Sequence, residues 1–377
     1  MVVIAPDKFK GSLTAQQVCE AVEAGLLAAD PALRVISLPL ADGGEGMSAL
    51  LTSFSGGTSV QVSVRDPLFR TIQATYGISR DGETAFIEMA TASGLMLLNR
   101  DERNPLKTSS VGTGDLVRNA LDRGVKHIVL GIGGSATNDA GIGMADALGV
   151  EFYDAMGEML PPIGWSLALV HKVDVSALHP RLREVNITIL CDVDNPLHGP
   201  EGAAFVFAPQ KGADQNMVHQ LDEGLRQYGH VLEYQFNKRM DFAGAGAAGG
   251  LAVSLVALAS VHIRRGADFI MDFVGLEDHI RSAEFVITGE GKIDGQTLSG
   301  KVVKGVTDLA RKWRKPVMAV AGKSDLTDQE LQSMGIGQLV VLADGKTPEQ
   351  EAMTRAFDLL KDRVSKAWLS MKSDKKA

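Results

Sequence analysis

The sequence of 377 residues contains little cysteine and little proline, and each shortage excludes a class of protein. The two cysteines, Cys19 and Cys191, are too few and too far apart for a disulfide framework, and no CxxC or paired-histidine spacing indicates a zinc site. Only 13 prolines accompany 45% hydrophobic residues, a composition that excludes low-complexity disorder. We therefore expect a packed globular protein in a reducing, cytoplasmic compartment.

The chain also lacks concentrated charge and a targeting segment. Its 38 basic and 46 acidic residues give a net charge of −8, and the acids are spread along the chain, which disfavours nucleic acids and anionic membranes as partners. The N-terminus has neither the basic region nor the small-residue cleavage site of a secretory signal. We expect a protein that is not exported.

Long hydrophobic runs are absent, and only one stretch of the sequence resembles one. Residues 243–261 carry no charge and have nearly the length of a membrane span. Four glycines in the first eight residues disfavour a continuous helix, so we expect a helix only over residues 251–261. The sequence predicts no membrane-spanning segment.

Both ends of the chain alternate between strand-like and helical patterns. At roughly 150 residues per domain, the length favours two to three domains, and we expect two. Strands are predicted at residues 2–5, 35–40, 285–288, 316–320 and 339–342, and helical stretches connect them. Because two strands alone cannot form a well-buried parallel sheet, we predict one doubly wound, Rossmann-like α/β domain built from residues 1–60 and 281–377.

The middle of the chain, residues 61–280, is predicted to be a second α/β domain inserted in the first. Three short segments at 60–64, 72–76 and 85–88 resemble an antiparallel meander, while strands at 127–130 and 185–190 alternate with helices. This pattern favours a mixed sheet. We expect a ligand cleft between the two domains.

Glycine, in contrast to cysteine and proline, is abundant. The 41 glycines make up about 11% of the chain, above the usual level of roughly 7%. Many of them fall in turns at residues 43–46, 131–135, 244–250 and 289–291. Three of these turns, all but the one at 244–250, follow a predicted strand and precede a predicted helix. Glycine lets backbone amides approach a phosphate group at such a turn, although tight packing alone explains any single one.

Carboxylates accompany these turns at the predicted carboxyl ends of strands. They are Asp7, Asp42, Asp192, Asp194, Glu290 and Asp294. In doubly wound sheets these ends line the ligand crevice, and Mg²⁺ prefers one or two carboxylates together with substrate phosphates. Lys8 and Lys10, after the first strand, could offset the charge of a transferring phosphoryl group or could belong to a solvated loop.

Several motifs together resemble the bacterial glycerate kinases of the glycerate 2-kinase type. The matching segments are 4–13 (IAPDKFKGSL), 41–46 (ADGGEG), 131–139 (GIGGSATND), 191–197 (CDVDNPL), 209–213 (PQKGA), 244–250 (GAGAAGG) and 287–294 (ITGEGKID). They occur in the family's order and span most of the chain. Lys292 departs from the pattern, because the family usually has arginine there, and lysine lacks the bidentate fork of arginine.

The resemblance implies ATP-dependent phosphorylation of D-glycerate, with Mg²⁺ as a cofactor and 2-phosphoglycerate favoured over 3-phosphoglycerate as the product. It also implies two different α/β domains and a cytoplasmic role in organic-acid catabolism. The oligomeric state, a homo-oligomer included, stays open. A nicotinamide-dependent oxidoreductase and a non-catalytic solute-binding protein are the two alternatives, although the GxGxxG match at 244–249 lacks a preceding strand.

We assign candidate roles to the residues of these turns and motifs. Asp192, at the end of a buried strand, is the candidate to accept the proton of the substrate hydroxyl. The full set is Asp192, Lys8 and Lys10 for catalysis; Gly133, Gly134, Ser135, Gly289 and Gly291 for ATP; Arg103, Lys211 and Asp42 for the substrate; and Glu290 and Asp294 for Mg²⁺, with Asp42 as a further metal candidate.

Overall fold

The structure is a computed structural model that describes residues 1–295, 297, 302–345 and 347–374. The chain forms two compact units, one from residues 1–42 and 267–377 and one from residues 43–266. These boundaries fall earlier in the chain than the expected ones, because α2 (Met47–Phe54) packs on strands of the second unit. At the other boundary, α9 (Gly266–Phe273) packs within the first unit, because a Cβ on Gly305 would lie 2.4 Å from Cε of Met271.

The first unit is built on a five-stranded parallel sheet with the order β13-β12-β11-β1-β2. Its strands are β1 (Val2–Ile4), β2 (Val35–Ser37), β11 (Phe285–Ile293), β12 (Val317–Ser324) and β13 (Ile336–Val341). Strands from both ends of the chain meet where β1 pairs with β11, Val3 lying opposite Val286. The predicted doubly wound parallel sheet is confirmed.

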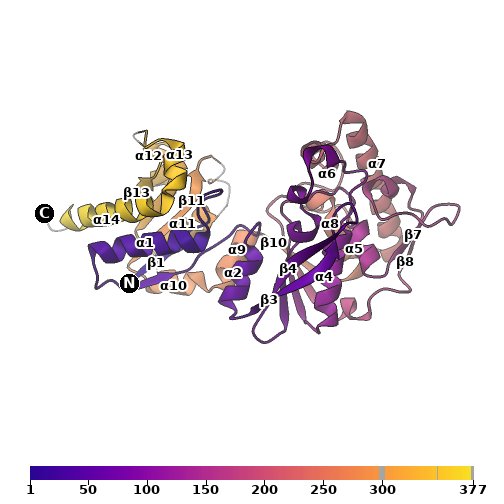
Figure 1. Cartoon of the computed structure of the whole chain (residues 1–377), viewed down its shortest axis with the longest axis horizontal. Helices are drawn as coiled ribbons and strands as arrows, with labels where there is room; N and C mark the ends of the chain where they lie inside the picture. The colour runs from indigo at the N-terminus through magenta and orange to yellow at the C-terminus, as the bar shows by residue number, and fades with distance from the viewer. Residues whose placement is uncertain (296, 298–301, 346, 375–377) are drawn as a thin grey trace. The chain divides into compact units, whose positions relative to one another are not determined.

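Helices cover this sheet and bury its apolar side chains. They are α1 (Ala15–Ala29), α9, α10 (Leu276–Ser282), α11 (Val302–Lys312), α12 (Asp328–Ser333), α13 (Glu349–Thr354) and α14 (Ala356–Asp374). Helices α1 and α14 lie side by side (Figure 1). Gly25 permits their contact, because a Cβ there would lie 2.5 Å from the Lys361 carbonyl oxygen. A capping box between Thr14 and Gln17 starts α1.

The second unit is built on a six-stranded mixed sheet with the order β10-β9-β6-β5-β4-β3. Its strands are β3 (Thr58–Arg65), β4 (Thr71–Ile78), β5 (Thr84–Glu88), β6 (His127–Gly131), β9 (Asn186–Leu190) and β10 (Ser260–Arg264). Strands β3, β4 and β5 are antiparallel, as the predicted meander requires, and β5, β6, β9 and β10 are parallel. The mixed α/β character is therefore confirmed.

The remaining elements of the second unit surround this sheet. The helices are α2, α3 (Ala90–Ser93), α4 (Val111–Asp122), α5 (Ile142–Ala147), α6 (Ala203–Phe207), α7 (Gln215–Phe236) and α8 (Leu251–Leu258). A separate hairpin pairs β7 (Glu151–Tyr153) with β8 (Lys172–Asp174). Short 3-10 turns occur at η1 (Leu95–Leu97), η2 (Arg100–Glu102), η3 (Gly164–Leu169), η4 (Pro180–Arg183), η5 (Pro209–Lys211) and η6 (Ala247–Gly249).

Two local predictions are wrong. The helix expected over residues 251–261 ends at Leu258, where the Lys238 ammonium donates to the Val256 carbonyl, and Val261 belongs to β10. The turn expected at residues 289–291 is instead part of β11, which continues to Ile293 because it pairs with β12 as far as Ser324. Within the described part of the chain, no helix is long and apolar enough to cross a membrane.

Candidate active site

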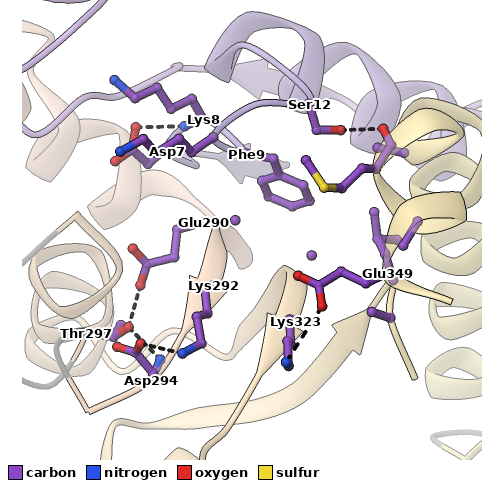
Figure 2. Close-up of a pocket in the computed structure, with 18 of the residues that line it drawn as sticks. Asp7, Lys8, Phe9, Ser12, Glu290, Lys292, Asp294, Thr297, Lys323 and Glu349 are labelled. Carbon is purple, nitrogen blue, oxygen red and sulfur yellow. Dashed lines mark hydrogen bonds and ion pairs between the residues drawn. The ribbon is translucent and has the colours of Figure 1, made fainter. Parts of the chain in front are cut away.

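A pocket of about 410 Å³ opens in the first unit at the carboxyl ends of β1 and β11. The strand order places this pocket where the winding of the sheet changes direction, which is the usual ligand position in doubly wound folds. Figure 2 shows Asp7 and Lys8 across the pocket from Glu290, Thr297 and Asp294. We call the acidic group of Asp7, Asp42, Glu290 and Asp294 the carboxylate pocket.

Asp7 is the most deeply buried acid of the carboxylate pocket, with 7% of its surface exposed. Its Oδ1 accepts a hydrogen bond of 2.7 Å from the backbone N–H of Lys8. Burial, and then the negative charges of Asp42 and Glu290, outweigh this bond and raise the pKa of Asp7 to about 7. A bound cation would relieve the repulsion among these acids.

The two candidate metal ligands, Glu290 and Asp294, are connected through Thr297. The Thr297 hydroxyl donates to Glu290 Oε1 at 2.5 Å and accepts from the Asp294 backbone N–H at 3.0 Å. Lys292 Nζ lies 3.1 Å from Asp294 and 2.8 Å from Asp325, and these hydrogen bonds raise its pKa. The ammonium of Lys292 therefore interacts with carboxylates of the protein itself.

The donor set of the carboxylate pocket fits Mg²⁺ better than a closed metal centre. Across residues 1–295, 297, 302–345 and 347–374, no three histidine, cysteine or acidic side chains are grouped to hold a metal ion. Mg²⁺ does not need such a group, because it takes one or two carboxylates and completes its shell with water and phosphate oxygens. Lys8 and Lys10 also line the pocket, where they could contact those phosphates.

Gly289 and Gly291 lie within β11, where their lack of a side chain permits close packing. A Cβ on Gly289 would lie 2.1 Å from the Val320 carbonyl oxygen, and a Cβ on Gly291 would lie 3.1 Å from the Lys10 nitrogen. Gly291 lines the pocket, whereas Gly289 is not among its lining residues. Contact of either glycine with ATP stays a prediction.

The glycine turn after β6 lies at the carboxyl edge of the second sheet, as predicted. Gly134 has a φ of +77°, a conformation that glycine adopts without strain. The turn that begins at Gly43 packs nearby, since a Cβ on Gly131 would lie 2.7 Å from the Gly43 carbonyl oxygen. At the end of β5, Glu88 accepts from the backbone N–H groups of Gly46 and Ser48 at 3.1 and 2.8 Å, which orients the start of α2.

Lys211 lies beneath this turn with only 2% of its surface exposed. Its ammonium donates to Ser135 Oγ at 2.7 Å and to the Thr137 carbonyl at 2.6 Å. Burial lowers the pKa of Lys211 to about 7, against the opposing effect of the Asp139 charge. Lys211, a predicted substrate residue, is thus in direct contact with Ser135, a predicted ATP residue. We call residues 133–139 together with Lys211 the lysine loop.

Asp139 anchors the lysine loop from inside the protein. Its Oδ2 accepts from the N–H and the hydroxyl of Ser110, both at 2.7 Å, and from the Gly143 N–H at 3.3 Å. These bonds link the loop to the N-terminal ends of α4 and α5. Burial nevertheless raises the pKa of the Asp139 carboxyl.

Several buried polar side-chain atoms in and beside the lysine loop lack a hydrogen-bond partner in the described residues. In the described residues, Thr137 Oγ1 and both polar atoms of the Asn138 side chain are buried without a partner, as is Arg103 Nε. The Arg103 backbone lies against Gly212, whose Cβ would stand 2.3 Å from the Arg103 carbonyl oxygen. Buried polar atoms of this kind usually bind water or a ligand.

Asp192 follows β9, the neighbour of β6 in the same sheet. Its carboxylate is exposed, and its Oδ1 accepts a 2.8 Å hydrogen bond from the Gly266 backbone N–H. That bond fixes the orientation of the carboxylate at the carboxyl edge of the sheet. Two residues further, Asp194 forms an exposed ion pair of 2.9 Å with Arg265.

The structure therefore groups the candidate residues within each unit. The first unit brings together Lys8, Lys10, Asp42, Gly291, Glu290 and Asp294. The second brings Ser135 to Lys211 and places Gly133, Gly134, Arg103 and Asp192 on loops of one unit. Sequence reasoning left Asp7, Asp139, Asn138 and Thr297 out of the candidate set, although the first three occur in motifs that it singled out.

The fold and the two residue groups define an α/β protein with ligand-binding features at the carboxyl ends of parallel strands. Residues 2–372 match the sequence profile of the glycerate kinase family. The chain is 44% identical to a glycerate kinase of Bacillus cereus over 93% of this chain and 92% of that protein. It is 44% identical to a glycerate 2-kinase of Escherichia coli, over 87% of this chain and 86% of that protein.

A solved structure agrees with these relatives. The crystal structure from Salmonella typhimurium LT2 of a protein assigned as glycerate kinase 2 superposes with a TM-score of 0.89, at 40% identity, and covers 100% of this chain and 99% of the other. The chain therefore belongs to the glycerate kinase family, and the resemblance seen in its motifs is confirmed. It is a kinase that phosphorylates glycerate, with ATP as the phosphate donor.

Proposed function

We propose that this kinase transfers the γ-phosphoryl group of ATP to the C2 hydroxyl of D-glycerate, with Mg²⁺ as cofactor, and releases 2-phosphoglycerate. The choice of C2 is supported by the relative from Escherichia coli that carries the name glycerate 2-kinase. The enzyme acts in the cytoplasm in the catabolism of organic acids. The proposal holds for a monomer and for a homo-oligomer.

The carboxylate pocket holds the metal in this proposal. The observation that carries the assignment is the pocket itself, which is lined by the carboxylates of Asp7, Asp42, Glu290 and Asp294. Burial and repulsion from neighbouring acids raise the pKa of Asp7 to about 7. Mg²⁺ relieves that repulsion when it is held by Glu290 and Asp294, directly or through water, with Asp42 as a further ligand. When bound, it neutralises charge on the phosphates, and Lys8 and Lys10 add positive charge beside it.

The lysine loop binds anionic groups. The backbone amides of Gly133, Gly134 and Ser135 donate to ATP phosphates, as amides in glycine turns do in other nucleotide sites. Lys211 and Arg103 bind the glycerate carboxylate, and the unpartnered Asn138 side chain lies in the same buried region. Of the two glycines in β11, Gly291 lines the pocket and is the better candidate for contact with ATP.

Asp192 orients the glycerate hydroxyl and accepts its proton as the new phosphate ester bond forms. The Gly266 N–H holds Oδ1 of Asp192, so the carboxylate has a fixed orientation in which to accept a hydrogen bond from the hydroxyl. Phosphoryl transfer demands positioning above all, and a carboxylate fixed by a backbone amide meets that demand.

Proton-coupled phosphorus NMR of the product from ATP, Mg²⁺ and D-glycerate tests the proposal. A phosphate ester at C2 couples to one proton and gives a doublet, whereas an ester at C3 couples to two protons and gives a triplet. We expect the doublet. A triplet would contradict the assignment to C2, and the absence of any new ester would contradict the activity itself.

A further inference from the structure

The cavity at the carboxyl ends of the first sheet has two halves of different chemistry. One half carries the four acids of the carboxylate pocket, to which the proposed function assigns Mg²⁺. The other, which we call the apolar half, is lined by Phe9, Leu342, Ala343, Ala352, Met353 and Ala356. The strand order separates Glu290 from Leu342, because β12 lies between β11, which contains the first, and β13, which precedes the second.

Two contacts join the segments that form the apolar half. The Ser12 hydroxyl, in the loop after β1, donates to the Met353 carbonyl of α13 at 2.7 Å (Figure 2). A Cβ on Gly11 would lie 3.4 Å from Met353 Cε, so the methionine side chain extends to the same loop. Phe9 and Leu342, at 3% and 1% exposure, belong to the apolar core of the unit. These contacts fix the shape of the apolar half.

Met353 gives the apolar half a surface that a ligand can cover, because this residue is 44% exposed. Covering apolar surface is favourable for a ligand group that is itself apolar. Mg²⁺, glycerate and the phosphates of ATP are charged, whereas the adenine base of ATP is flat, aromatic and uncharged. The cavity volume of about 410 Å³ lies within the range of small-molecule sites. Of these ligands, adenine is the part that matches the apolar half.

We infer that the adenine base of ATP binds in the apolar half of this cavity, against Met353 and Ala343. The inference deepens the proposed function and rests on it, because that function places Mg²⁺ and phosphates at the acids of the same cavity. The base then adds affinity through apolar contact, away from the charged groups. The apolar half thereby distinguishes ATP from inorganic polyphosphates, which carry similar phosphates without a base.

Adenosine is the probe, because it carries the base and lacks the phosphates that interact with Mg²⁺. The chain has 14 methionines, and in protein labelled with ¹³C-methyl methionine the spectra of Met353→Ser and Met156→Ser assign two of their signals. We expect adenosine, added without Mg²⁺, to shift the Met353 methyl signal saturably, whereas D-ribose should not. The signal of Met156, an 89% exposed residue of the second unit, should stay in place.

Two variants test the contact with the base. Ala343→Leu fills part of the apolar half and should weaken adenosine binding about tenfold, as followed by the Met353 signal. Ala367→Leu is the matched control, because Ala367 is also a half-buried alanine packed on the core of the first unit, away from the lining of the cavity. Its affinity should equal that of the wild type. Met353→Ser should weaken adenosine binding about threefold to fivefold in ligand-detected NMR, which also serves if Ala343→Leu does not fold.

Three results would overturn the inference. The first is a Met353 signal that does not move up to the solubility limit of adenosine. The second is equal affinity for adenosine in Ala343→Leu and Ala367→Leu. The third is adenosine that stays bound at saturating ATP, because the base of ATP would then bind elsewhere. Failure of the proposed Mg²⁺ site is a separate result, since it appears as an unchanged Mg²⁺ requirement in Glu290→Gln while adenosine still binds.

Discussion

Burial shifts the pKa of one charged side chain in each unit, upward in the carboxylate pocket of the first unit and downward in the lysine loop of the second. Burial raises the pKa of Asp7 to about 7 and lowers that of Lys211 to about 7. Around Asp7 the neighbouring acids add to the effect of burial, whereas near Lys211 the Asp139 charge opposes it. The first site thus has acids whose effect on Asp7 is only partly offset by Lys8, and the second already contains a counter-charge in Asp139.

The two regions also differ in their free hydrogen-bonding groups. Asp7 accepts from a backbone amide, and Glu290 accepts from Thr297. The lysine loop instead buries the Asn138 side chain and Thr137 Oγ1 without partners in the described residues. This difference is the basis for proposing a cation site in one unit and a site for polar or anionic ligands in the other.

The largest expected effect is on catalysis in the second unit. Asp192→Asn should lower kcat about 100- to 10,000-fold, because an amide cannot accept the hydroxyl proton. Steady-state turnover with ATP and glycerate measures it. Asp194→Asn is the matched control, since Asp194 forms an exposed ion pair, and its kcat should stay close to that of the wild type. Full turnover in Asp192→Asn would remove Asp192 from the mechanism.

The second-largest expected effect is on the use of ATP, when Gly134 in the lysine loop is replaced. Gly134→Val should lower kcat/KM for ATP about tenfold to hundredfold, because a β-branched residue does not readily adopt the φ of +77° at this position. Gly157→Val is the matched control, since Gly157 has a φ of +84° and a Cβ placed on it would meet no other atom within 4 Å. Equal losses in both variants would show that backbone strain alone is responsible.

A stability measurement tests the imbalance at Asp7. Because its folded pKa lies above the unfolded value, the folded state binds more protons between about pH 4 and pH 7, and stability falls as pH rises through that window. Asp7→Asn should therefore raise the free energy of unfolding without Mg²⁺ by roughly 1–3 kcal/mol at pH 8 and by little at pH 4. Urea unfolding at the two pH values measures the change.

A control variant defines what would contradict this prediction. Asp278→Asn removes an acid that is exposed on α10 and paired with Arg281 at 2.9 Å. It should show no comparable gain at pH 8. If Asp7→Asn behaves like Asp278→Asn at both pH values, the carboxylate pocket does not hold a strained acid.

Much of the fold could be predicted because parallel strands leave clear apolar segments between helices. The strands at both chain ends and the meander were found in this way. β10 was missed because it directly follows α8, so residues 251–261 form one uncharged segment without a turn signal. The extension of β11 through Gly289 and Gly291 was missed because two glycines usually interrupt a strand, whereas here they allow β11 to pack closely against β12 and the loop after β1.

Only those candidate residues that directly follow a predicted strand could be predicted to lie together. Asp42, Glu290 and Asp294 come from strands that lie in one sheet, and they line one pocket with Lys8. The contact of Lys211 with Ser135 spans 76 residues of sequence and depends on how the loops pack. Burial of Lys211 and Asp139 likewise has no local pattern, because each is a charged residue in a polar segment.

The most direct test of the separate roles of the carboxylate pocket and the lysine loop measures the Mg²⁺ requirement and the KM for glycerate in one variant of each region. In Glu290→Gln we expect the Mg²⁺ concentration for half-maximal activity to rise about tenfold, while the KM for glycerate changes little. In Lys211→Met we expect the KM for glycerate to rise about tenfold, while the Mg²⁺ requirement is unchanged. If both variants shift the same constant, or each shifts the constant assigned to the other, the carboxylate pocket and the lysine loop do not have the separate roles given to them.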